Sequence, residues 1–158
     1  MIRDEERGIE WDCHKVLREW YFCVDFREFE KGVQLYTEDA DWDAHGLTLK
    51  GRDQILEAVS GALRTGTARH IMGNTVVNVI DENHATSRSY RTCYYDPDEG
   101  VDGVAELEGP HRLEDDVADL VRTDDGWKIS RRVATVSFRC RPQEAFGLDD
   151  WIKAEGKL

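Results

Sequence analysis

Four segments with strand-like sequence fill the second half of the chain, and they limit the possible folds more than any other feature. They are rich in β-branched and aromatic residues, and they cover residues 69–80, 84–95, 114–123 and 127–138. Short polar turns at 81–83 and 124–126 join them in pairs, which predicts antiparallel hairpins. One long antiparallel sheet follows from this pattern, and other elements must cover its inner face.

The covering elements are predicted in the first half of the chain. Residues 5–24 and 52–64 carry apolar side chains at spacings of three and four, which is typical of helices with one buried face. A second, shorter helix is expected over 26–36. Residues 38–45 alternate between apolar and polar side chains, which predicts a half-buried strand with Trp42 directed inward.

This order of elements predicts an α+β fold, with three helices packed on a curled, mostly antiparallel sheet to form a cone. A cone of this kind offers a pocket for a small molecule. The 158 residues suit one domain, which we expect to span 1–141, with 142–158 as a tail or short helix. The connection 96–113 is long for a small domain, and such loops are often functional.

Charge and composition exclude several classes of partner. With 21 Lys and Arg against 33 Asp and Glu the net charge is −12, so we expect no binding to nucleic acid. No apolar run approaches the roughly 18 residues of a membrane span, and the N-terminus is charged, so a cytoplasmic protein without a membrane partner is expected. The cysteines at 13, 23, 93 and 140 form no C-x-x-C pair, and we interpret them as small buried hydrophobes.

The motifs of serine hydrolases, P-loop enzymes, zinc proteases and dinucleotide-binding enzymes are absent from the sequence. Asp41, Asp43 and His45 alternate along one strand, but their side chains would stand in a row rather than around a point. We therefore interpret them as a solvated polar face and expect no metal site.

Two other polar residues leave alternatives open. His70 shares a strand face with Met72 and Asn74, and it is either a core histidine bonded to a carbonyl or a catalytic base. Asp25 follows the first helical pattern and is either a helix cap or a partner for such a base.

The segments 21–42, 51–52 and 69–74 resemble the SnoaL-like branch of the NTF2-like superfamily. That branch includes scytalone dehydratase, bile-acid dehydratase and the hexachlorocyclohexane dehydrochlorinase. The resemblance extends over about residues 8–140 and implies the NTF2-like cone described above. It also implies that Asp25 and His70 are a catalytic pair.

The resemblance implies a cofactor-independent lyase or isomerase that acts on a hydrophobic cyclic small molecule. His70 would be the general base, and Asp25 would hold its ring and stabilise the imidazolium. The candidate substrate-binding residues are Tyr21, Trp42, Met72, Asn74 and Arg132. The additional tyrosines and second histidine of the dehydratases have candidates in Tyr21, Tyr36 and His45.

The inward arginine of the last strand is ambiguous. Strict alternation places Arg131 on the face of Trp127 and Ile129, whereas the resemblance favours Arg132. A β-bulge between them would reconcile the two.

Two other functions are compatible with the same resemblance. The chain could be a structural β subunit of an aromatic-ring dioxygenase, or a non-catalytic protein that binds a small molecule in the cone. A β subunit would purify together with a larger subunit, whereas an autonomous enzyme would assemble only with itself.

We predict a homo-oligomer, a dimer or trimer. A curled sheet leaves one face to be covered, and the strand 127–138 carries Val133, Val136 and Phe138 on both of its faces. Light scattering at micromolar concentration should return a multiple of the 18.2 kDa chain mass. A monomer mass under these conditions would contradict the prediction.

Overall fold

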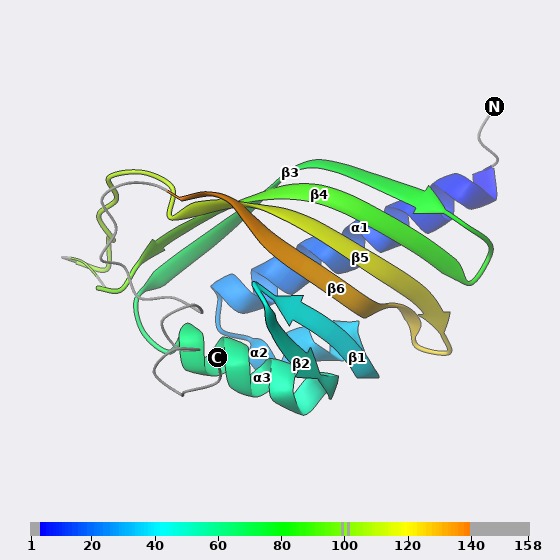
Figure 1. Ribbon diagram of the computed structural model, residues 1–158, viewed down its shortest axis with the longest axis horizontal. Helices are drawn as coiled ribbons and strands as arrows, with labels where there is room; N and C mark the ends of the chain where they lie inside the picture. Colours follow the sequence, from blue (N-terminus) through cyan, green and yellow to red (C-terminus); the bar gives the residue numbers. More distant parts are fainter. Residues whose placement is uncertain (1–3, 99, 101, 140–158) are drawn as a thin grey trace.

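A six-stranded sheet curls around the long first helix (Figure 1). The computed structural model describes residues 4–98, 100 and 102–139, so the expected tail 142–158 lies outside the described residues. The helical elements are α1 (Asp4–Asp25), α2 (Phe29–Gly32), the 3-10 turn η1 (Val33–Leu35) and α3 (Gly51–Ala62). The strands are β1 (Tyr36–Ala44), β2 (Leu47–Lys50), β3 (Thr67–Val79), β4 (His84–Asp96), β5 (Arg112–Thr123) and β6 (Gly126–Arg139).

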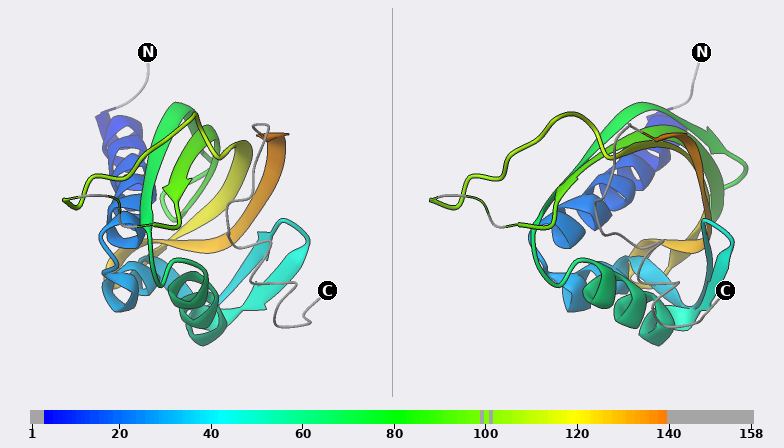
Figure 2. Two further views of the ribbon diagram at one scale, coloured as in Figure 1. Left: turned by 90° about the vertical axis from the view of Figure 1, so that its left-hand side faces the viewer. Right: turned by 60° about the vertical axis from the view of Figure 1, so that its left-hand side comes forward.

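The strand order is β2-β1-β6-β5-β4-β3, and every neighbouring pair is antiparallel except β1 and β6. The edge strands β2 and β3 do not pair, so the sheet stays open, and Figure 2 shows α1 in its hollow with α3 below. The predicted α+β class and the curled, mostly antiparallel sheet are confirmed. The third helix, α3, lies between β2 and β3 in the chain.

The predicted helix over 26–36 is wrong in its length. Arg27 adopts a φ of 58°, a left-handed conformation that interrupts the helix, and only Phe29–Gly32 is α-helical before the 3-10 turn. The chain therefore turns sharply after Asp25. This turn leaves the end of α1 facing the start of β3.

The core lies between α1 and the concave face of the sheet. Trp20 of α1 is buried and meets Tyr36 and Trp42 of β1 edge-to-face, with ring centroids 4.9 and 5.9 Å apart. The buried face of α3 packs against β1 and β2 and closes one end of the hollow. The inward direction predicted for Trp42 is therefore correct.

β-Bulges in β6 and β3 change which side chains face the hollow. In β6, Asp119 opposes Arg131 while Leu120 opposes Ile129, so Ser130 is an extra residue. The bulge keeps Ile129 buried, exposes Arg131 and buries Arg132. It accounts for the conflict between strict alternation and the position of Arg132.

In β3, Gly73 and Asn74 together oppose the single residue Tyr90. The pattern His70, Met72, Asn74 is therefore broken after Met72, which is half-buried. Asn74 is exposed, and the prediction that it lines the pocket is wrong. A bulge reverses the face of every residue that follows it, and alternation alone does not reveal where one occurs.

Gly66 allows the backbone before β3 to lie close to the backbone at the end of β4. Its φ is +75°, and a Cβ at this position would lie 2.1 Å from the carbonyl oxygen of Asp96 and 2.8 Å from Cα of Pro97. Gly103 has the same φ of +75° but no atom within 4 Å of the corresponding Cβ position.

We predict that Gly66→Ala lowers the free energy of unfolding by roughly 2–4 kcal/mol more than Gly103→Ala. Both variants place alanine in the left-handed region, but only the first also forces backbone atoms apart. Urea denaturation followed by circular dichroism measures the difference. Equal losses in the two variants would contradict this account of the contact.

Candidate active site

The end of α1 and the start of β3 meet through the side chains of Asp25 and His70. Oδ1 of Asp25 lies 2.5 Å from Nδ1 of His70, and Oδ2 accepts the backbone N–H of His70 at 2.8 Å. The two side chains are 7% and 6% exposed. Asp25 does not cap the second helix, because the cap position of α2 is Glu28, which makes no side-chain cap bond. The fold thus brings together two residues that are 45 positions apart in sequence.

The contact determines which nitrogen of His70 faces the hollow as a base. A carboxylate can only accept a hydrogen bond, so Nδ1 carries the hydrogen and Nε2 keeps its lone pair. The imidazole stacks on the ring of Tyr21, with centroids 5.2 Å apart and an interplanar angle of 25°. Burial acts to lower the pKa of His70, but the charge of Cys93 and hydrogen bonds to Asp25 and Cys93 outweigh it, so the pKa is raised.

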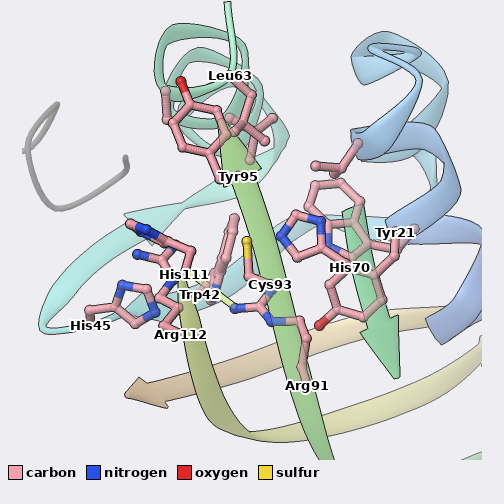
Figure 3. Close-up of a pocket in the computed structure, with 14 residues that line it drawn as sticks. Tyr21, Trp42, His45, Leu63, His70, Arg91, Cys93, Tyr95, His111 and Arg112 are labelled. Carbon is pink, nitrogen blue, oxygen red and sulfur yellow. The ribbon is translucent and has the colours of Figure 1, made fainter. Parts of the chain in front are cut away.

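The imidazole of His70, which carries Nε2, lines a cavity in the hollow of the sheet (Figure 3). The empty space is about 560 Å³ when the open mouth is counted. One part of the wall is apolar and includes Val59, Ala62, Leu63 and Tyr95. The opposite part is polar and includes His45, His70, Arg91, Cys93, His111 and Arg112. Such a division suits a mainly apolar molecule with one polar group.

Glu114 is the counter-ion of the cationic part of this wall. It is fully buried on β5, its Oε1 lies 2.5 Å from Nε of Arg112 and 2.8 Å from Nε2 of His45, and its Oε2 pairs with Arg91. Two guanidinium groups therefore share one carboxylate. The site keeps a positive character toward a ligand even though its charges are paired.

His45 reaches the cavity because β1 ends before it. Its φ is 58°, so it belongs to the turn after Ala44, and its side chain turns inward. The prediction that His45 shares a solvated face with Asp41 and Asp43 is wrong for this reason. Asp41 instead pairs with Lys50 at 2.6 Å, and Asp43 accepts the N–H of Gly46 at 2.8 Å.

A second buried ion pair lies behind Tyr21. Nε of Arg132 donates to Oδ1 of Asp116 at 2.9 Å, and Nη1 donates to the hydroxyl of Tyr36 at 2.8 Å. Nη2 contacts Asp116 and the hydroxyl of Tyr21, which itself donates to Asp116. Burial acts to raise the pKa of Asp116, but the Arg132 guanidinium outweighs it and lowers that pKa.

The candidate binding residues thus divide into four groups. Tyr21 and Trp42 line the cavity, whereas Arg132 lies behind Tyr21 and is not part of the described wall. Met72 lines a separate hollow on the other side of the Asp25–His70 contact. Asn74 is exposed.

Sequence reasoning missed Arg91, Arg112, Glu114 and Asp116. A usable signal was present, because Glu114 and Asp116 share strand parity with the apolar Ala118 and Leu120 and should therefore face inward.

Within the part of the chain that the structure describes, no group of three or more His, Cys, Asp or Glu side chains is suitable for a metal ion. None of the described helices is both long and apolar enough to cross a membrane.

Comparisons with known proteins agree on the fold. The sequence profile of the SnoaL-like domain matches residues 8–133. No curated protein matches the chain. A proposed scytalone dehydratase from Novosphingobium aromaticivorans superposes with a TM-score of 0.74 at 16% identity, covering 92% of this chain and 95% of that one. LinA superposes with a TM-score of 0.70 at 17% identity, covering 89% and 95%.

ActVI-ORFA from Streptomyces coelicolor has a TM-score of 0.66 at 19% identity, covering 80% of this chain and 95% of that one. A proposed aromatic ring hydroxylase from N. aromaticivorans has a TM-score of 0.72 at 17% identity, covering 91% and 96%. At these identities the superpositions establish a shared fold.

We predict that Glu114→Gln lowers the free energy of unfolding by about 3–5 kcal/mol, because it leaves two buried guanidinium groups without their counter-charge. Asp115→Asn, one residue away on the exposed face, is the matched control and should change stability little. Urea denaturation of both variants provides the comparison. A small, equal effect would mean that Glu114 is not required to compensate Arg91 and Arg112.

Proposed function

The chain belongs to the SnoaL-like domain family, and we propose that it is a cofactor-independent lyase or isomerase of the dehydratase type. The observation that carries this proposal is the Asp25–His70 contact at the edge of a cavity. The carboxylate occupies Nδ1, which leaves Nε2 as a base on the cavity side. A histidine with this environment can abstract a proton near neutral pH without a cofactor.

The proposed reaction starts at a carbon beside a carbonyl group. Nε2 of His70 takes the proton, and the electrons of the broken C–H bond pass into an enolate. Asp25 stabilises the imidazolium that forms. In an elimination the enolate expels a β-hydroxyl group, which takes the proton back from His70 and leaves as water. In an isomerisation the proton returns to another carbon of the same molecule.

The cavity wall supports a particular class of substrate. Arg91 and Arg112 are cations near the site of proton transfer, and they would favour negative charge on the substrate oxygen. The apolar side chains of α3 and the ring of Tyr95 would hold a hydrocarbon framework. We therefore propose a hydrophobic cyclic ketone, with Tyr21 and Trp42 as further contacts. One protein of this fold is named as a proposed scytalone dehydratase, so scytalone is a reasonable first probe.

The alternative functions make different demands on the same residues. A structural β subunit needs an intact fold and a larger partner, but it does not need a base at position 70. A non-catalytic binder would keep affinity for a cyclic ketone after removal of the imidazole. Substitution of His70 therefore separates an enzyme from both alternatives.

We predict that His70→Ala lowers turnover by about 10²–10⁴-fold, because the general base is lost. Asp25→Asn should also lower turnover, because an amide neither stabilises the imidazolium nor enforces the same tautomer. The assay follows loss of water from scytalone and from a panel of cyclic β-hydroxy ketones by mass spectrometry. In D2O, NMR detects deuterium uptake beside the carbonyl.

The exposed pair His84–Asp81 provides the matched control, since Nδ1 of His84 lies 2.9 Å from Oδ1 of Asp81 in the hairpin between β3 and β4. His84→Ala should leave turnover unchanged. If His70→Ala kept the wild-type rate, the assignment of the base would be wrong. Absence of turnover, together with purification in complex with a larger subunit, would favour the structural role.

A further inference from the structure

Cys93 is directly opposite His70 on neighbouring strands, and both side chains reach the same cavity. Figure 3 shows the sulfur of Cys93 beside the imidazole of His70. The thiol and the imidazole are therefore neighbours in one cavity wall. The thiol donates a hydrogen bond to the carbonyl oxygen of Tyr94, 3.8 Å from Sγ, but this oxygen is far less basic than an imidazole nitrogen. Asp25 is hydrogen-bonded to Nδ1 of His70, and Cys93 lies beside the same ring on the neighbouring strand.

The other described cysteines have different surroundings. Cys13 and Cys23 are buried on α1 outside the cavity wall, and burial raises the pKa of both thiols. Burial also acts to raise the pKa of Cys93, but the charge and hydrogen bond of His70, followed by Arg112 and Arg91, lower it to about 7. A thiol that only filled space would not need a base and two cations around it.

Two buried donors in the same wall also point to a ligand. Trp42 and Arg91 are each 4% exposed, yet the Nε1–H of Trp42 and the Nε–H of Arg91 have no hydrogen-bond acceptor among the described residues. Buried N–H groups are normally satisfied by protein, water or a bound molecule. A ligand with a carbonyl oxygen offers the acceptor that these donors lack. The observation is independent of the cysteine.

We propose that Cys93 is a nucleophile, that His70 is its base with Asp25 as the positioning residue, and that the cavity takes small α,β-unsaturated carbonyl compounds as covalent ligands. This activity goes beyond the proposed elimination. It adds the formation of a covalent bond between the protein and its ligand, which the proposed elimination does not involve.

The addition balances without any co-reactant. Cys93 gives its proton to Nε2 of His70, and the thiolate sulfur forms a bond to the β-carbon of the acceptor. The π electrons of the C=C bond move to the carbonyl oxygen as an enolate, which the buried donors stabilise. The imidazolium then returns the proton to the α-carbon. The net change is addition of S–H across C=C, and its reversal releases the ligand.

The reaction can be tested with N-ethylmaleimide and with the smaller acrylamide on the folded full-length protein. Peptide mapping by mass spectrometry assigns each adduct to its cysteine, so labelling elsewhere does not interfere. We expect an adduct at Cys93 that disappears in Cys93→Ser and persists in the control Cys23→Ser. No substrate turnover is needed, so the result is separate from the test of the proposed elimination.

The pH dependence of labelling tests the role of His70. The titratable and charged side chains that share the cavity wall with the thiol are Tyr21 from α1, His45 after β1, His70 from β3, Arg91 and Tyr95 from β4, His111 before β5 and Arg112 from β5. Helix α3 adds only apolar side chains to the wall. For a thiol with a pKa of about 7 the thiolate fraction rises about 10-fold between pH 6 and pH 8, against about 100-fold for an ordinary pKa of about 9. The comparison uses ratios of rates for one protein, so a constant partition of the reagent into the cavity cancels.

We therefore predict a rate ratio near 10 in the wild type and near 100 in His70→Gln, with Asp25→Asn between them. Circular dichroism tests whether each variant is folded. If the His70 variant does not fold, the comparison of the wild type with the Asp25 variant still tests the proposal. Cys93 left unlabelled by both reagents in the folded wild type would overturn the proposal. So would the same pH dependence in the wild type and in the folded variants.

Discussion

The buried ion pair between Arg132 and Asp116 is the interaction on which the rest of the interior depends. It joins β6 to β5, and its hydrogen bonds extend to Tyr36 at the start of β1 and to Tyr21 on α1. A buried charge is tolerated only when it is paired and hydrogen-bonded, because loss of one partner leaves the other uncompensated. The pair therefore constrains α1, β1, β5 and β6 to one relative arrangement. The same constraint positions the ring of Tyr21, on which His70 stacks.

The concave face of the sheet is polar where an ordinary core would be apolar. Glu114, Arg91 and Arg112 are buried on adjacent strands, and both guanidinium groups pair with the one carboxylate. A fold that only needed stability would be served equally well by apolar side chains of the same volume. We interpret the charges as a property of the cavity. They place cations near a base without leaving any of them unpaired.

His70 is the side chain through which the two proposed activities meet. Asp25 holds one of its ring nitrogens, and the ring lies beside Cys93 in the wall of the cavity. A proton on Nε2 can come either from a carbon acid in the cavity or from the thiol, so the two processes compete for one lone pair. The product of an elimination beside a carbonyl is itself an α,β-unsaturated carbonyl compound. Addition of Cys93 to that product would modify the active site covalently with the product of its own reaction.

The local sequence determined the type and order of the elements, because hydrophobic periodicity is a local property and survives without knowledge of the fold. The helical face of 5–24, the inward Trp42 and the two hairpin turns were all predictable on this basis. Asp25 and His70 were singled out through family resemblance, not through spacing. Only the tertiary structure decided which residues meet. Pairing between distant segments produces the bulges at Ser130 and Asn74, and these bulges bury Arg132 and expose Asn74. The positive φ of His45, which turns its side chain inward, and the contact of α1 with β3 also depend on the tertiary structure.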